Sequence, residues 1–138
     1  MTVTTDFVVD INDFDDIVTA RRAGHELAKQ LGFSLTDVTM IATAISEIAC
    51  NITSYAGQGK VRVGVQLRDG RQALVVRAED DGPGIADVQR ALDDGYSTGR
   101  GLGLGLPGAR RLMDRLQIES ELGRGTVVEM WKWIPDSG

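Results

Sequence analysis

The stretch "VRVGVQLRDGRQALVVRAED", residues 61–80, decides the fold class because its apolar side chains recur with a period of two. Apolar residues at every second position alternate with polar or small ones and predict a half-buried strand: Val61, Val63, Val65 and Leu67. Asp69-Gly70 is a hairpin signal, and residues 72–80 follow it as the returning strand. The stretch therefore predicts a β-hairpin.

Helical spacing dominates the residues before this hairpin. Asn12 or Asp13 can cap a first helix that ends near Gly32. Ser34–Asp37 fits a capping box and opens a second helix, which stops before Gly57. The apolar residues of the second helix form one stripe: Val38, Ile41, Ile45, Ile48 and Ile52.

The remaining segments complete an α+β arrangement. They are a first strand at 2–11, a short helix at 86–94, a helix from Pro107 to about Leu116, and strands at 117–122 and 126–134. This order predicts a two-layer α/β sandwich, in which a mixed, mostly antiparallel sheet carries helices on one face. No linker or repeat divides the chain, so we expect one domain over residues 1–138.

Composition narrows the class of protein. A hydrophobic content of 42% and a charged content of 25% are typical of a globular protein. No apolar run approaches the roughly 20 residues that span a bilayer, and the first residues lack a secretory signal pattern. A single cysteine excludes an internal disulfide, so we expect a cytoplasmic protein without a membrane partner. A net charge of −5 without a basic run argues against nucleic acid as the main partner.

Glycine is concentrated in four of the predicted loops, which hold 12 of the 17 glycines. The densest tract, "GRGLGLGLPG" at 99–108, places backbone N–H groups without a Cβ directly before a helix. The N-terminus of a helix attracts anions, and Arg100 adds a positive charge. The tract predicts a phosphate-binding loop, although a flexible surface loop fits the same composition.

Two further groups of residues suggest chemistry. Glu47 and Asn51 share one face of the second helix, beside its apolar stripe. A carboxylate and an amide oxygen at such a position can hold Mg²⁺. The carboxylate can also act as a base toward a hydroxyl. Asp80, at the end of a strand, can accept a hydrogen bond from an exocyclic amine, while Gly82 and Gly84 let a flat ring approach. A solvated helix face and an ordinary turn are the alternatives for these two groups.

The order and spacing of these groups resemble the GHKL ATPase superfamily, which has the Bergerat fold. The motifs that carry the resemblance are Glu47-x-x-x-Asn51, Asp80-x-Gly82-x-Gly84, Gly99-x-Gly101-Leu-Gly103-Leu and Gly125-Thr126. The stretches "SEIACNITSYAGQG", "DDGPGI", "ALDDGYSTG" and "GLPGARRLMD" are similar to the bacterial anti-sigma-type serine/threonine kinases, in particular the switch kinases of the stressosome. The resemblance covers nearly the whole chain.

The resemblance implies a role for each motif residue. Asn51 would coordinate a Mg²⁺ ion that bridges the phosphates of ATP, and Glu47 would be the catalytic base that positions the substrate hydroxyl. Asp80 would accept a hydrogen bond from the adenine amine, with support from Thr126. The other nucleotide-binding residues would shape the pocket and close a lid over the phosphates: Gly82, Gly84, Gly99, Arg100, Gly101, Leu102, Gly103, Leu104 and Gly105.

The resemblance also implies a function and partners. The chain would be an ATP-dependent protein serine/threonine kinase that phosphorylates a STAS-domain protein and, after release from it, activates a PP2C-type phosphatase. The alternatives are an anti-sigma factor that sequesters a sigma subunit under nucleotide control and a nucleotide binder without transfer activity; the intact Glu47 speaks against the latter. Trp131 and Trp133 share one face of the last strand and fit either a core or a docking surface.

Overall fold

The computed structural model describes residues 4–82, 105–121 and 123–135. The elements in chain order are β1 (Thr4–Ile11), α1 (Phe14–Gln30), α2 (Leu35–Tyr55), β2 (Gly59–Arg68), β3 (Arg71–Asp80), α4 (Gly105–Leu112), β4 (Arg115–Glu121) and β5 (Gly125–Trp133). The short helix predicted over residues 86–94 lies outside the described residues. Among the described residues the elements form an α+β fold, as predicted.

Side-chain caps set the starts of the two long helices. The Asp16 backbone N–H donates to Asp13 Oδ1 at 3.2 Å, and Asp16 Oδ2 accepts from the Asp13 backbone N–H at 3.3 Å, which closes a capping box. Ser34 Oγ accepts from the Asp37 backbone N–H at 3.1 Å at the start of α2. These contacts confirm Asp13 and Ser34 as the capping residues.

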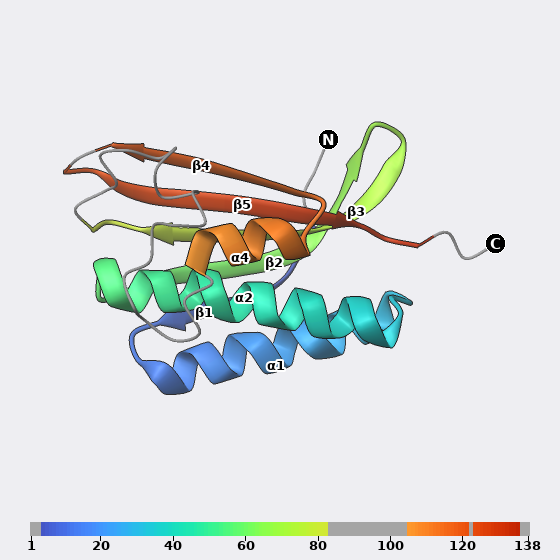
Figure 1. Ribbon diagram of the computed structural model, residues 1–138, viewed down its shortest axis with the longest axis horizontal. Helices are drawn as coiled ribbons and strands as arrows, with labels where there is room; N and C mark the ends of the chain where they lie inside the picture. Colours follow the sequence, from blue (N-terminus) through green and yellow to red (C-terminus); the bar gives the residue numbers. More distant parts are fainter. Residues whose placement is uncertain (1–3, 83–104, 122, 136–138) are drawn as a thin grey trace.

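In the described part of the chain, five strands form one sheet in the order β1-β2-β3-β5-β4, and their four pairings are antiparallel. Asp69 and Gly70 connect β2 to β3 with φ angles of 52° and 78°. Positive φ at both central residues is what a tight two-residue hairpin turn requires, and it confirms the predicted hairpin. Figure 1 shows α1, α2 and α4 together on one side of this sheet.

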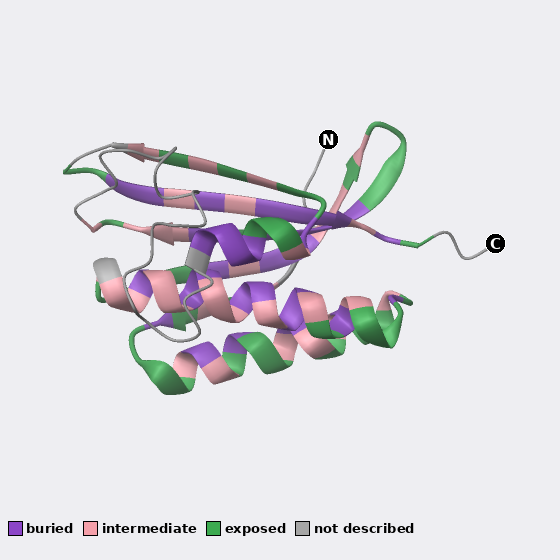
Figure 2. Ribbon diagram, in the orientation of Figure 1, coloured by how far each residue is buried: buried purple, intermediate pink, exposed green. Residues whose placement is uncertain are grey.

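The main core lies between the helices and the sheet (Figure 2). Its largest fully buried side chains come from α2, the central strands and the end of β1: Ile11, Val38, Ile41, Ile45, Ile48, Ile52, Val61, Val63, Leu74, Val76 and Met130. By length and composition Leu35–Ser54 could also cross a membrane, so the expectation that no apolar run reaches that length was wrong. Its apolar side is buried against the sheet, so α2 is the core helix of this fold.

The helix after the glycine tract is shorter than predicted. The sequence predicts a helix from Pro107 to about Leu116, whereas α4 spans Gly105–Leu112. Arg115 and Leu116 belong instead to β4, where they pair with Trp131 and Met130 of β5. Hydrogen bonding to a neighbouring strand overrides the weak local preference for helix at these positions.

Candidate functional site

One row of register partners crosses all five strands at the end of the sheet where α2 terminates. From the β1 edge the row reads Ile11, Gly59, Asp80, Thr126 and Ser120. Antiparallel pairing of β3 with β5 therefore places Asp80 directly opposite Thr126. Two residues that the sequence singled out in separate motifs are neighbours in the fold.

The Asp80 carboxyl is half-buried at the end of β3. Burial raises the pKa of this carboxyl above its ordinary value of 3.8, and the charge of Asp81 adds to the rise. Hydrogen bonds from the backbone N–H groups of Gly82 and Thr126 act in the opposite direction, the first of them 2.9 Å from Asp80 Oδ1. A carboxylate held in this way is a fixed hydrogen-bond acceptor at the end of the sheet.

Thr126 is buried, and its hydroxyl is already engaged. Thr126 Oγ1 lies 2.9 Å from Ser120 Oγ, which donates its own proton to the Gly125 carbonyl at 3.0 Å. The two hydroxyls are hydrogen-bonded to each other, and the backbone N–H of Thr126 helps to lower the pKa of Asp80. Sequence reasoning did not identify Ser120; its one signal is its position opposite Thr126 across the last hairpin.

Two glycines allow backbone segments to approach closely around Asp80. A Cβ at Gly82 would lie 2.5 Å from the Cβ of Ala56, the C-cap of α2. Gly125 has a φ angle of 105°, and a Cβ there would overlap the Asp80 carbonyl oxygen. Gly82 was predicted to admit a flat ring, and the structure adds a packing reason for glycine at that position.

Glu47 and Asn51 lie one turn apart on α2 and are both half-buried. Each is followed by a core isoleucine, Ile48 or Ile52, so both side chains lie at the edge of the core, as the helical spacing predicts. Gly105 is the first residue of α4, which packs against α2. The other predicted lid and pocket residues lie outside the described part of the chain: Gly84, Gly99, Arg100, Gly101, Leu102, Gly103 and Leu104.

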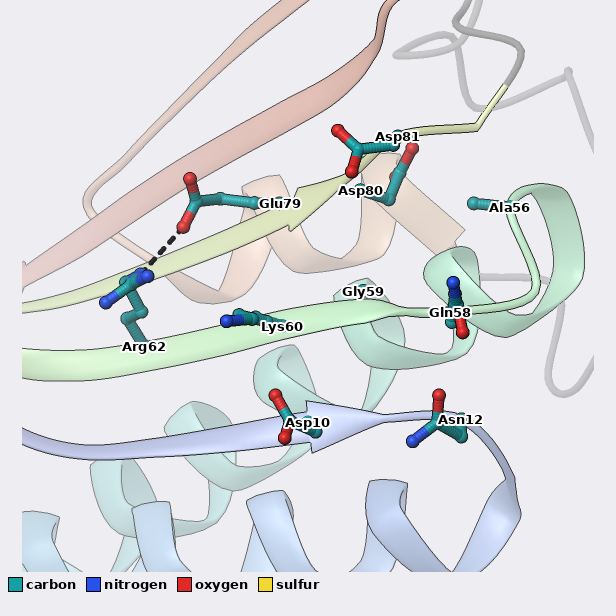
Figure 3. A pocket seen from close by; sticks show the side chains of 10 residues that line it. All are labelled: Asp10, Asn12, Ala56, Gln58, Gly59, Lys60, Arg62, Glu79, Asp80 and Asp81. Atoms are coloured by element: carbon teal, nitrogen blue, oxygen red, sulfur yellow. Dashed lines mark hydrogen bonds and ion pairs between the residues drawn. The ribbon is translucent and has the colours of Figure 1, made fainter.

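A pocket of about 550 Å³ opens beside Asp80 (Figure 3). It is lined by Asp10, Asn12, Ala56, Gln58, Gly59, Lys60, Arg62, Glu79, Asp80 and Asp81. Arg62 and Glu79 are joined by an ion pair of 2.7 Å on the sheet face that turns away from the helices. Sequence reasoning gave only Asp80 of these residues a role in binding, because the polar positions of a half-buried strand look like ordinary solvated positions.

This pocket covers only one side of the candidate site. Glu47 and Asn51, on the helical side, are not among the described residues that line it. The side chains that would act on phosphates therefore lie on the α2 side of Asp80, and the pocket continues from Asp80 onto the opposite sheet face. We take the α2 side as the candidate nucleotide site because the carboxylate and amide oxygens suited to a hard cation are there.

Comparisons with known proteins match nearly the whole chain. Residues 12–132 match the family described as the histidine kinase-like ATPase domain. The serine/threonine-protein kinase RsbT of Bacillus subtilis is 47% identical over 119 residues, which cover 86% of this chain and 90% of RsbT. The anti-sigma F factors of Caldanaerobacter subterraneus subsp. tengcongensis and Pasteuria penetrans are 30% and 34% identical, over 83% and 86% of this chain and 83% of each relative.

Proposed function

Because the chain belongs to the histidine kinase-like ATPase family, as a serine/threonine-protein kinase of the RsbT type, we propose that it transfers the terminal phosphoryl group of ATP to a hydroxyl of a STAS-domain protein. The observation that carries this proposal is the convergence of Asp80, Thr126 and the end of α2 at one end of the sheet. Three segments far apart in the sequence meet there, as a nucleotide site requires.

The chemistry of the residues at this end fits ATP. The Asp80 carboxylate is an acceptor held in place by the Gly82 N–H, and the exocyclic amine of adenine is a donor of complementary kind. The side-chain oxygen of Asn51 would hold Mg²⁺ at the edge of the core, where an amide oxygen suits a hard cation. When bound, ATP supplies the phosphoryl group and Mg²⁺ neutralises part of its charge.

Glu47 would orient the acceptor hydroxyl and take its proton. It lies one turn before Asn51 on the same face of α2, so a base and a metal ligand are presented side by side. The N-terminal turn of α4, beginning at Gly105, would direct backbone N–H groups toward an anion. The remaining tract residues would complete the lid over the phosphates: Gly99, Arg100, Gly101, Leu102, Gly103 and Leu104. Gly84, outside the tract, would help to shape the adenine pocket.

The partners belong to the same proposal. The 47% identity to RsbT supports a kinase that acts in the cytoplasm, leaves its STAS-domain substrate after phosphorylation and then activates a PP2C-type phosphatase. The relatives named anti-sigma F factor favour a second candidate, the nucleotide-controlled sequestration of a sigma subunit. Co-purification with a sigma subunit and not with a STAS-domain protein would favour this second candidate.

Two pairs of variants test the proposed roles. Asp80→Asn should abolish ATP binding in calorimetry, whereas Asp81→Asn, which changes the neighbouring exposed carboxylate, should retain it. Glu47→Ala should bind ATP and lose phosphoryl transfer to a purified STAS-domain protein, whereas Glu26→Ala on the exposed side of α1 should keep both activities. Wild-type affinity in Asp80→Asn would remove the adenine assignment, and an unchanged transfer rate in Glu47→Ala would remove the base assignment.

A further inference from the structure

A second, smaller apolar cluster lies on the sheet face that turns away from the helices. We call it the tryptophan patch, and it consists of Ala73, Val75, Trp131 and Trp133. It is separate from the main core, to which the alternating residues of β3 and β5 contribute. Val75, the register partner of Trp131, precedes Asp80 by five positions on β3, which at about 3.3 Å per residue separates the near end of the patch from the candidate site by roughly 17 Å.

Arginine side chains cover the faces of both tryptophan rings. The guanidinium of Arg68 lies 4.1 Å from the centroid of Trp131, and that of Arg71 lies 4.8 Å from the centroid of Trp133. Arg115, on β4, is the register partner of Trp131 and shares its face. The patch is therefore apolar at its centre and cationic at its rim.

Two carboxylates lie next to the patch: Glu129 is bound to arginine, and Asp114 Oδ2 accepts from the backbone N–H of Trp133 at 2.8 Å. Glu129 accepts from Arg68 at 2.8 Å and from Arg77 at 3.4 Å. Within the described ranges, Arg71 and Arg115 have no carboxylate within ion-pair distance. Two unpaired positive charges thus flank the tryptophans, on a chain whose net charge is −5.

Trp131 also has an unused donor. Its indole N–H is buried and finds no acceptor among the residues that the structure describes. Buried donors in folded proteins are nearly always paired, so this unpaired N–H is an exception among the described residues. Tryptophan and arginine are also the residues that contribute most strongly at the centres of protein interfaces.

From these observations we propose that the tryptophan patch docks an acidic segment of a partner protein. Carboxylates of that segment pair with Arg71 and Arg115, and an apolar side chain packs against the half-buried Trp133. A two-fold contact with a second copy would place these unpaired arginines against each other. Single-stranded nucleic acid would need free ring faces for stacking, and the arginines occupy them.

The chain supplies its own probe for this docking site, because both of its tryptophans lie in the patch. A synthetic glutamate-rich peptide with one central leucine should cause a saturable change in tryptophan emission. The same peptide with lysine in place of glutamate should not. Arg71→Glu should weaken binding about tenfold or more, and Arg115→Glu, on another strand, should do the same. The matched control is Arg110→Glu, an exposed arginine of α4 on the helical side.

Four results would overturn the proposal. They are the absence of saturable binding, equal weakening by Arg110→Glu, tighter binding of an oligothymidylate than of the acidic peptide, and a dimer in sedimentation that Arg71→Glu dissociates. Circular dichroism of each variant checks that it folds. Asp80→Asn should leave peptide binding unchanged, so failure of the nucleotide assignment and failure of the docking site are separate outcomes.

Discussion

Replacing Gly125 by alanine tests whether the start of β5 fixes the position of Asp80. The φ angle of Gly125 is 105°, and a Cβ would overlap the Asp80 carbonyl oxygen and lie 2.9 Å from the Asp81 Cα. Gly123, in the same turn, has a φ angle of 81°, and a Cβ there would meet no described atom within 4 Å. Alanine at Gly123 therefore adds backbone strain alone, whereas alanine at Gly125 adds strain and a steric overlap.

The expected magnitudes follow from these two terms. A left-handed backbone costs a non-glycine residue about 1–2 kcal/mol, which is the full expected effect of Gly123→Ala. Relief of an overlap with main-chain atoms requires a shift that costs about 1–3 kcal/mol in a packed region. Gly125→Ala should thus lower the free energy of unfolding by about 2–5 kcal/mol and weaken ATP binding, because the atoms that must shift belong to Asp80 and Asp81.

Urea denaturation gives the free energy of unfolding of both variants, and calorimetry gives their affinity for ATP. We expect Gly123→Ala to retain wild-type affinity and Gly125→Ala to lose it. The reasoning would be refuted if the two variants were equally stable and bound ATP equally well.

Two further predictions concern titration and a buried cation. Burial raises the pKa of Asp80 in the folded state. Between about 3.8 and the raised value, the native state therefore keeps a proton that the unfolded state has lost. As the pH rises through this interval, the Asp80 carboxyl lowers the free energy of unfolding. Asp80→Asn should therefore gain stability relative to wild type over that interval in thermal melts at a series of pH values; a relative loss would contradict the burial argument. Lys132 is 9% exposed, and its Nζ donates to the Leu112 carbonyl at 3.2 Å. Lys132→Met leaves that acceptor unpaired and should cost about 1–3 kcal/mol in urea denaturation, whereas Lys29→Met on the exposed side of α1 should change stability by less than about 0.5 kcal/mol. Equal effects of the two methionine variants would show that the Leu112 contact does not stabilise the end of α4.

Local patterns predicted those parts of the fold in which neighbours along the chain decide the structure. The period of two in residues 61–67 and the Asp69-Gly70 signal predicted the hairpin. Ser34 predicted the start of α2, and the start of α1 was predicted at Asn12 or Asp13, of which the structure has Asp13. The end of α4 was predicted too late, because Arg115 and Leu116 take their hydrogen bonds from β5. Pairing between strands is information that a helical pattern does not contain.

In the candidate site too, the sequence predicted some residues and missed those that depend on contacts between strands. The motif order indicated Asp80 and Thr126, and the register of β3 with β5 makes them neighbours. Ser120 could not be predicted, because its bond to the Thr126 hydroxyl depends on side-chain geometry across a hairpin. The sequence left Trp131 and Trp133 open between core and docking surface, and the structure places them in a separate cluster on the far sheet face.

Backbone amide shifts on addition of Mg²⁺ and ATP test the nucleotide assignment most directly, because they report on every described strand at once. We expect the largest shifts at Asn51, Gly82 and Thr126, around the end of α2 and the end of β3, and no shift at Trp131 or Trp133. Shifts confined to the tryptophan patch, with Gly82 and Thr126 unchanged, would contradict it.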